Sequence, residues 1–541
     1  MRRRIVGSLL TAAVALSVTA CGGGNSTGDS AQGASGAPQQ GGKLIVGMQY
    51  EPVTLDPHVT GQANGIRIIL NMCDSLVYAD DKGQVQPWLA ESWEANPEGT
   101  AYTFHLKKDV KFSDGTPFNA QAVKFSWDRI MDPKTASQSA ISALRPYKES
   151  QVVDDSTLKV TLSEPSAIWL KNLGAATTAP VSPAAVQKLG DQFGRSPVCV
   201  GPFKLKEWKE KESVTLVRNP DYNSPSPAFG QKGAPVLDEV TWKFIPENQV
   251  RFSTLETGET NAIEDVPAPF VANVKADPQK YTLLNVPYPG SPRQYMINTK
   301  QFPTDDIAVR QAILYGVNTK AIIKTLYADA FPDGNGPMGA ATWGASKGIF
   351  RELYPQGADK ANAVLDQAGW KPGPGGIRVK DGKRLEIVVN VMSDVPEYGE
   401  LGQLLQAQLR DVGMDLKLKS LSRSPWYASN AKGDYNITGM GLWSTDPDML
   451  KSLYRTDGSV FTWSHFTNPD YDKLVDEGAR TSDPTKRLEI YKQAQEIVMK
   501  EALVLPIYDQ VNLLATQSNI KGIFFDANAY PHFYATYYVK K

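Results

Sequence analysis

The segment GMGLWSTDPD at residues 439–448 joins the end of an apolar run to an acidic turn. The apolar run from Tyr435 to Leu442 predicts a buried β-strand that ends at Trp443. The Thr-Asp-Pro-Asp sequence that follows is typical of a turn. Ligands of layered α/β sheets bind at strand ends, so Trp443 and Asp446 are candidate ligand-binding residues. An aromatic face beside a carboxylate suits the binding of a solute, and it does not by itself suit a reaction.

The remainder of the chain mixes strand and helix patterns. Its 541 residues exceed what one hydrophobic core can hold, so two or three domains are expected. Predicted strands cover residues 102–106, 158–162 and 236–246, and predicted helices cover 122–130, 309–317, 401–412 and 488–498. Asn119 and Thr304 are the expected N-caps of the first two helices. This mixture predicts α/β architecture.

The first 20 residues have the features of a signal peptide. Three arginines precede an apolar run at 5–20 that is short for a membrane span, and the run ends in VTAC at 18–21. This ending resembles the lipobox of bacterial lipoproteins. The resemblance implies lipidation of Cys21 and an extracytoplasmic protein anchored to the bacterial cell membrane; an ordinary secretory leader is the alternative. Residues 21–42, rich in Gly, Ser and Gln, are expected to form a flexible tether.

Cys73 and Cys199 are the two remaining cysteines. In an oxidising exterior two cysteines can form a disulfide. Two buried free thiols are the alternative. The sequence does not supply the Cα separation that a disulfide requires, so both alternatives stay open.

The composition and the motifs argue against several classes of function. A net charge of −1 gives no basic excess for binding nucleic acid. The histidines, His58, His105, His465 and His532, are scattered and form no zinc-binding motif, so no metal and no cofactor are expected. GASKG at 344–348 matches a nucleophile-elbow motif, but a Gly- and Pro-rich stretch precedes it where that motif needs a strand. We therefore expect no catalytic residues and no enzyme activity.

Six blocks of sequence occur in an order that resembles one known family. They are EPVTLDPH at 51–58, FSDGTPF at 112–118, GPF at 201–203, YMINT at 295–299, VRQAI at 309–313 and LDQAGW at 365–370. The family they resemble is that of the extracellular solute-binding proteins of peptide and nickel ABC importers, family 5. The resemblance covers nearly all of residues 43–541.

The resemblance implies a two-lobed α/β fold of the periplasmic-binding-protein type, with a hinge and an extra domain inserted in the first lobe. Carried over to this sequence, lobe I is expected at 43–77, 199–291 and 513–541, the inserted domain at 78–198, and lobe II at 292–512. The chain then crosses between the lobes twice, near residues 291 and 512. Two crossings leave the lobes free to bend toward each other around a ligand.

The resemblance also implies a role for Asp446. In peptide-binding members an Asp just after the lobe II tryptophan receives the amino group of the peptide, and Asp446 falls there when the residues are counted from Trp443 without a gap. A buried ammonium group needs a paired carboxylate, because desolvating an unpaired charge is costly. The alternative is that Asp446 is a turn carboxylate that caps a helix at 449–454.

Four further residues are candidates for the wall of the cleft. Tyr50 and Glu51 end the first predicted strand, and the resemblance implies that they face the cleft. Trp463 and His465 are expected to contribute to the opposite wall, with a packed surface loop as the alternative.

The implied function is the capture of a small solute outside the membrane and its delivery, chemically unchanged, to an ABC permease and its ATPase. We expect a monomer that closes on a short peptide, with a metal chelate or another non-peptide solute as the alternative. An envelope hydrolase is a candidate from another class, but the sequence offers no nucleophile–base pair for it. A lipoprotein that senses a solute without transporting it is a third candidate.

Overall fold

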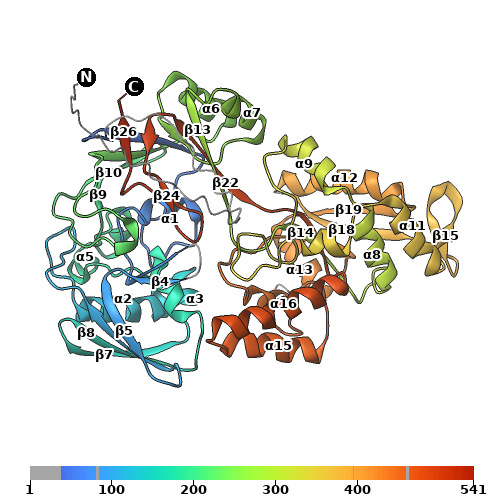
Figure 1. Cartoon of the computed structure of the whole chain (residues 1–541), viewed down its shortest axis with the longest axis horizontal. Helices are drawn as coiled ribbons and strands as arrows, with labels where there is room; N and C mark the ends of the chain where they lie inside the picture. The colour runs from blue at the N-terminus through green and yellow to red at the C-terminus, as the bar shows by residue number, and fades with distance from the viewer. Residues whose placement is uncertain (1–37, 81–83, 394, 459–461, 541) are drawn as a thin grey trace, which may run out of the picture. The chain divides into compact units, whose positions relative to one another are not determined.

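The computed structural model in Figure 1 describes residues 38–80, 84–393, 395–458 and 462–540. The predicted signal peptide, Cys21 and most of the predicted tether lie outside the described residues. Pro38 and Gln39, which the sequence analysis assigned to the tether, instead form β1 (Pro38–Gln39), antiparallel to β26 (Tyr537–Val539). No helix in the described ranges combines the length and the apolar character that crossing a membrane requires.

A seven-stranded sheet is built from three separate stretches of the chain. Its central strand, β2 (Lys43–Met48), runs parallel to β11 (Glu239–Phe244) on one side and to β12 (Ala262–Ile263) on the other. A strand with neighbours on both sides and helices near it is mostly apolar, which explains the sequence LIVGM in β2. The other strands are β9 (Phe203–Lys209), β10 (Ser213–Arg218), β13 (Tyr281–Pro287) and β22 (Val511–Gln517), and the helices of this part are α1 (Ala63–Ile69), α5 (Pro183–Leu189), α6 (Asn248–Thr257) and α7 (Ala268–Ala276).

A four-stranded antiparallel sheet has a hydrophobic core of its own. Its strands, in sheet order, are β5 (Ala90–Ala95), β6 (Ala101–Leu106), β8 (Thr157–Leu162) and β7 (Tyr147–Asp154). Phe104, Trp127 and Trp169 meet in this core with ring centroids 6.0–6.2 Å apart. Asn119 accepts a hydrogen bond from the Ala122 N–H (3.0 Å), which confirms Asn119 as an N-cap. The neighbouring elements are β3 (Val77–Ala79), β4 (Val85–Pro87), α2 (Ala120–Met131), α3 (Ala140–Leu144) and α4 (Trp169–Asn172).

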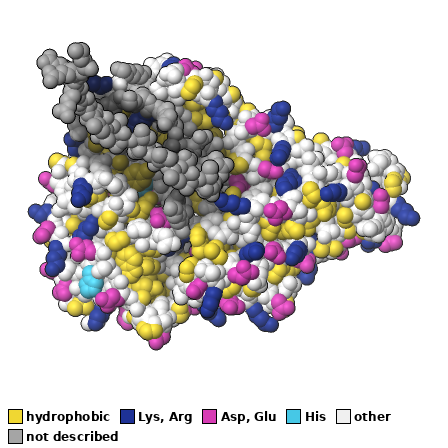
Figure 2. Space-filling model, in the orientation of Figure 1, with side chains coloured by type: hydrophobic (Ala, Val, Ile, Leu, Met, Phe, Trp, Pro, Cys, Tyr) yellow, Lys and Arg dark blue, Asp and Glu magenta, His cyan; other side chains and the backbone are white. Residues whose placement is uncertain are grey.

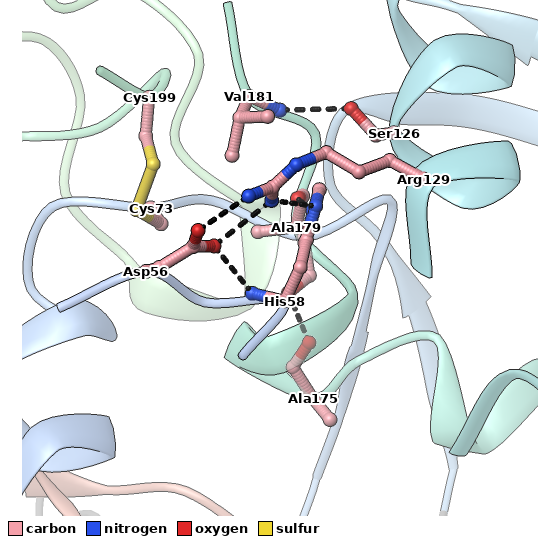
Figure 3. Close-up of a disulfide and its surroundings, with 10 residues drawn as sticks. Asp56, His58, Cys73, Ser126, Arg129, Ala175, Ala179, Val181 and Cys199 are labelled. Carbon is pink, nitrogen blue, oxygen red and sulfur yellow. Dashed lines mark hydrogen bonds and ion pairs between the residues drawn. A yellow bond between two sulfur atoms is a disulfide. The ribbon is translucent and has the colours of Figure 1, made fainter. Parts of the chain in front are cut away.

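A disulfide joins the two ends of the stretch of chain that carries the four-stranded sheet (Figure 3). Cys73 and Cys199 are bonded, with an S–S distance of 2.04 Å and a Cα–Cα distance of 5.0 Å, so the disulfide alternative is the one observed. Next to it the Asp74 N–H donates to the Val200 carbonyl (2.7 Å). The chain therefore leaves the seven-stranded part and returns to it at adjacent, covalently joined points.

An ion pair between Arg129 and Asp56, also drawn in Figure 3, is a second link between the part with the four-stranded sheet and the part with the seven-stranded sheet. Arg129 of α2 donates to both oxygens of Asp56 (3.0 and 2.5 Å), and its Nη1 lies 2.8 Å from His58 Nδ1. Burial lowers the pKa of His58 to about 4, so the ring is neutral and Nδ1 accepts while Nε2 donates to the Ala179 carbonyl (2.9 Å). His58 therefore holds two parts of the fold together.

A five-stranded sheet forms the other half of the fold, in the order β19 (Asp415–Leu421), β18 (Glu386–Met392), β20 (Ile437–Met440), β14 (Arg293–Ile297) and β21 (Val504–Tyr508). The strand predicted at 435–442 is β20, and all four of its residues are buried. In Figure 1 α12 lies alongside β18 and β19, and α15 and α16 lie side by side. The helices of this half are α8 (Ile307–Gly316), α9 (Thr319–Tyr327), α10 (Ile349–Leu353), α11 (Ala358–Gln367), α12 (Pro396–Arg410), α13 (Arg423–Lys432), α14 (Met449–Tyr454), α15 (Pro469–Arg480) and α16 (Pro484–Lys500).

The N-cap of α8 differs from the prediction. α8 begins at Ile307, and the Asp306 carboxylate accepts a hydrogen bond from the Ala308 N–H (3.0 Å). Thr304, the predicted cap, donates to the Gln301 carbonyl (2.9 Å) in the turn before the helix. Both residue types can cap a helix, so the composition alone did not separate them.

Two short segments join the seven-stranded sheet to the five-stranded one. Residues 288–292 connect β13 to β14, and residues 509–510 connect β21 to β22. These segments lie where the sequence analysis expected the two crossings. The limits assigned to the inserted domain and to the two lobes remain predictions.

Charged side chains are mixed over the face that Figure 2 shows. Lys and Arg side chains alternate there with Asp and Glu side chains, and no patch of one sign dominates. This distribution agrees with a net charge of −1.

Candidate ligand-binding cleft

A cavity of about 510 Å³ is lined by residues from the three parts of the chain that carry the seven-stranded, the four-stranded and the five-stranded sheet. We call it the main cavity. Its wall comes from residues 61–66 at α1, 139–143 and 168–177 of the part that carries the four-stranded sheet, 443–446 after β20, and 526–530 near the C-terminus. A narrower recess of about 90 Å³ shares seven of these lining residues and adds Lys171 and His532. We call this the inner recess.

Trp443 presents an aromatic face to the main cavity. Its ring centroid lies 4.3 Å from that of Tyr288 and 5.7 Å from that of Tyr530, yet 42% of the residue is exposed. Arg67 holds Tyr288 in place by donating to its hydroxyl (2.7 Å), and Arg67 is in turn paired with Glu264 and Asp265 (2.8 and 2.7 Å). The indole is therefore positioned by its neighbours without being covered by them.

The backbone around Trp443 is fixed by residues 288–292, the first of the two segments that connect the large sheets. The Ser291 N–H donates to the Leu442 carbonyl (2.8 Å), and the Leu442 N–H donates to Ser291 Oγ (2.7 Å). Gly290 has φ +120°, and a Cβ there would lie 2.3 Å from the Leu442 oxygen, so only glycine permits this approach. The strand end that carries Trp443 is thus tied to a segment that joins the two large sheets.

Asp446 also lines the main cavity, but its charge is already paired. Its two oxygens accept hydrogen bonds from Arg487 Nη1 and Nη2 (2.7 Å each), and Oδ1 also accepts from the Asp448 N–H (2.9 Å) just before α14. Both side chains of the ion pair are nearly buried. This pairing favours the turn interpretation of Asp446 over the amine anchor, since a carboxylate paired with Arg487 has no unbalanced charge for an ammonium group, and the part of Asp446 in ligand binding stays a prediction.

Lys171 reaches from α4 to the turn that contains Asp446. Its Nζ donates to the Thr445 carbonyl (2.9 Å). Burial lowers the pKa of Lys171, and Arg487 acts in the same direction, whereas Asp446 and Asp80 raise it. This hydrogen bond links the two sides of the cleft.

Asp526 is a second carboxylate on the cavity wall, and the sequence analysis missed it. It begins the loop of a hairpin formed by β24 (Phe524–Phe525) and β25 (Pro531–His532). Its Oδ1 accepts from the N–H groups of Asn528 and Tyr530 (2.9 Å each), and Oδ2 lies 4.0 Å from His532 Nε2. Burial raises the pKa of Asp526 to about 6 and lowers that of His532 to about 3, so the neighbouring imidazole is neutral. The sequence DANAY at 526–530 reads as an ordinary turn and carries no signal of this site.

Four of the predicted site residues lie outside the main cavity. Glu51 accepts from Trp208 Nε1 (2.8 Å) and from the Lys211 N–H (3.0 Å), and the adjacent Tyr50 is exposed elsewhere on the surface. Trp463 is buried in the core of the second half, 4.8 Å from the Trp426 ring. His465 Nε2 lies 3.3 Å from the Asn430 carbonyl at the end of α13. The structure therefore brings Trp443 and Asp446 together and places Tyr50, Glu51, Trp463 and His465 in other packing environments.

Within the described ranges, no group of three or more His, Cys, Asp or Glu side chains could hold a metal ion.

The fold and the cavity define a two-lobed α/β solute-binding protein of the periplasmic type. The sequence profile of the bacterial extracellular solute-binding proteins, family 5 Middle, matches residues 84–462. The chain therefore belongs to this family.

Relatives and solved structures agree with this assignment. The chain is 25% identical over 496 residues to the glutathione-binding protein GsiB of Escherichia coli (strain K12), covering 88% of this chain and 91% of that protein. It resembles the structure of NikA from Brucella suis in complex with Fe(III)-EDTA, with a TM-score of 0.81 and 25% identity over 92% of this chain and 100% of that one. The structure of the ABC transporter-associated periplasmic binding protein DppA from Helicobacter pylori, in complex with the peptide STSA, has the same fold, with a TM-score of 0.71 and 24% identity over 93% of this chain and 99% of that one.

Proposed function

We propose that this chain is the substrate-binding component of an ABC importer. It binds a small solute outside the cytoplasm, closes around it and delivers it chemically unchanged to a permease and its ATPase. Membership of family 5 supports the class of function, and the related DppA of Helicobacter pylori is an ABC transporter-associated periplasmic binding protein. Lipidation at Cys21 would keep the binding protein at the membrane, and a monomer is the form that we propose to dock on the permease.

The main cavity is the observation that carries this proposal. Its wall is shared between residues 61–66 and 526–530, residues 139–177, and residues 443–446, which lie on different sides of the two connecting segments. A solute that contacts all of them stabilises the closed arrangement, because it loses contacts when the parts separate. Ligand binding and closure are thereby coupled.

The size of the cavity supports a ligand of the dimensions of a short peptide. A volume of about 510 Å³ falls within the range that small-molecule sites occupy. GsiB binds glutathione and the DppA structure holds a peptide, which places a short peptide first. A metal chelate is the second candidate, supported by the Fe(III)-EDTA in the NikA structure and by the pairing of Asp446 with Arg487, which removes one anchor for a peptide amine.

The first experiment is native mass spectrometry of the protein purified without denaturation, which identifies any solute carried through purification. Calorimetry with that solute then compares the wild type with Trp443→Ala. We expect the variant to lose roughly tenfold or more in affinity while its melting temperature changes little, because Trp443 is exposed toward the cavity.

Tyr427→Ala is the matched control, since Tyr427 is also 42% exposed but does not line the main cavity. Equal affinity of the wild type and Trp443→Ala would contradict the proposed binding role of Trp443. A chemically altered solute after incubation would contradict the proposal as a whole.

A further inference from the structure

We propose that Asp526 binds a positively charged group of the solute, an ammonium or a guanidinium, in the main cavity. This inference rests on the proposed function and names the chemistry of its ligand. It assigns the cation-binding role to a residue on the opposite side of the cleft from Asp446.

The partners of Asp526 are all neutral. Two backbone N–H groups, of Asn528 and Tyr530, donate to Oδ1, and the closest group to Oδ2 in an ion-pairing position is the neutral His532 ring at 4.0 Å. His532 Nε2 itself has no hydrogen-bond partner among the described residues. No Lys or Arg within the described ranges forms an ion pair with Asp526. A carboxylate in this position is a charge removed from bulk water without a compensating cation.

Asp526 is accessible from the cavities, which distinguishes it from carboxylates whose hydrogen bonds only stabilise the fold. Asp526 lines both the main cavity and the inner recess, and 18% of its side chain is exposed there. Asp509 is a useful comparison, because it too accepts from two backbone N–H groups, although it is buried and Asp526 is partly exposed. In Asp509, however, each oxygen has its own donor, the Asn335 N–H (3.1 Å) for Oδ1 and the Ala340 N–H (2.7 Å) for Oδ2, and the residue does not line either cavity. In Asp526 both backbone donors use the same oxygen.

The surroundings of Asp526 suit a cation. The loop that begins at Asp526 carries Tyr530, whose ring lies 5.7 Å from that of Trp443. The faces of aromatic rings attract ammonium and guanidinium groups, and the Arg67 guanidinium already lies 5.7 Å from the centre of the Tyr530 ring. The charge of Arg67 is balanced by Glu264 and Asp265. Lys171, the cationic side chain of the inner recess, is bonded to the Thr445 carbonyl, and the charges that shift its pKa are Asp446, Arg487 and Asp80. A cation on the solute would therefore be the first one to balance Asp526.

This chemistry separates the candidate ligands. A peptide with a free amino terminus, a basic amino acid or an amine-bearing opine carries the required group, whereas a purely anionic chelate or a neutral sugar does not. Among the ligands considered above, the inference favours an amine-bearing solute over an anionic chelate.

The first test needs no mutation. The wild-type protein is titrated by calorimetry with trialanine, N-acetyltrialanine, glutathione, arginine, spermidine, glucose and Fe(III)-EDTA. We expect the tightest binder to carry an ammonium or guanidinium group, and N-acetylation of trialanine to abolish any binding of that peptide. The inference is overturned if glucose, N-acetyltrialanine or Fe(III)-EDTA binds more tightly than every cationic compound. It is also overturned if none of the cationic compounds binds.

The second test uses Asp526→Asn with Asp74→Asn as its matched control, because Asp74 is a buried carboxylate whose two hydroxyl donors, from Tyr222 and Ser224, use one oxygen and which lines neither cavity. Asparagine keeps an oxygen that accepts from Asn528 and Tyr530, so the loop is expected to persist, and the melting temperature checks this. Affinity for the tightest cationic compound should fall roughly tenfold or more in Asp526→Asn and stay within about twofold in Asp74→Asn.

The two proposals fail differently. Unchanged affinity in Asp526→Asn overturns the role of Asp526 and leaves the solute-binding function intact. A wild-type protein that carries no solute through purification and binds none of the seven compounds overturns the role of Asp526 and also counts against the proposed function.

Discussion

Asp446 and Asp526 lie on two sides of one cavity, and they differ in their partners. Asp446 holds the two terminal nitrogens of Arg487 at 2.7 Å. Among the described residues, Asp526 has uncharged neighbours, namely two backbone N–H groups, the side chains of Asn528 and Tyr530, and the neutral ring of His532. A paired buried carboxylate contributes to folding, and its removal leaves the partner charge uncompensated. An unpaired one costs free energy until something else supplies the cation. The comparison shows that Asp446, next to Trp443, already has a charged partner within the fold, and it supports the proposal that Asp526 binds the cation of the solute.

The largest expected effect is on folding, from Asp446→Ala. The variant leaves the buried Arg487 guanidinium without its carboxylate, so the free energy of unfolding should fall by about 3–5 kcal/mol. Urea unfolding followed by tryptophan fluorescence measures this change. The double variant Asp446→Ala/Arg487→Met should recover part of the loss, because it removes both charges. A single variant within about 1 kcal/mol of the wild type would show that the pair contributes little.

A smaller effect of opposite sign is expected from Asp526→Asn in the ligand-free protein. Burial raises the pKa of Asp526 from 3.8 to about 6, so the folded state holds the proton more tightly than the unfolded state. The carboxylate therefore lowers stability as the pH rises from about 4 through 6. The adjacent titratable groups do not offset this, since His532 is neutral in this range and Tyr530 stays protonated.

Asp526→Asn should accordingly be more stable than the wild type at pH 8, by roughly 1–3 kcal/mol, and no more stable at pH 4. Chemical unfolding at a series of pH values measures the difference. A difference that does not depend on pH would mean that Asp526 is as well solvated in the folded state as in the unfolded one. That result would remove the contrast with Asp446.

The smallest effect is expected from Lys171→Met. This variant removes the hydrogen bond from Nζ to the Thr445 carbonyl across the cleft. Because that bond stabilises the closed form for every ligand, affinity should fall by roughly twofold to tenfold for all bound compounds alike. Asp526→Asn should weaken cationic compounds alone. Calorimetry on both variants, with the tightest cationic compound and with an analogue of it that lacks the cation, separates the two patterns: Lys171→Met should keep the preference for the cation and Asp526→Asn should lose it. A loss of that preference in Lys171→Met would place that lysine in the ligand site.

Much of the fold could be predicted because its signals are local. The apolar run at 435–442 predicted β20, and Asn119 predicted the start of α2. The order of the family blocks predicted two lobes with two crossings, and the connecting segments at 288–292 and 509–510 lie there. Cys73 and Cys199 were left open, because pairing depends on a Cα separation that only the folded chain defines.

The site could be predicted only in part, because burial and pairing are properties of the folded chain. Trp443 was found from the strand end, but the pairing of Asp446 depends on Arg487, 41 residues later in the sequence. Trp463 looked like a wall residue, and the fold buries it against Trp426. Asp526 is distinctive because no Lys or Arg of the described residues forms an ion pair with it, and the sequence does not show which charged side chains the fold brings together.

The disulfide has a practical consequence for handling the protein. Every residue from 74 to 198 lies inside the covalent ring that Cys73 and Cys199 close. A protease that cuts once within this ring would produce two fragments that migrate as one band until the sample is reduced. Gels run only without reductant would therefore overlook nicked molecules, and ligand titrations on such a preparation would average intact and cleaved binding sites.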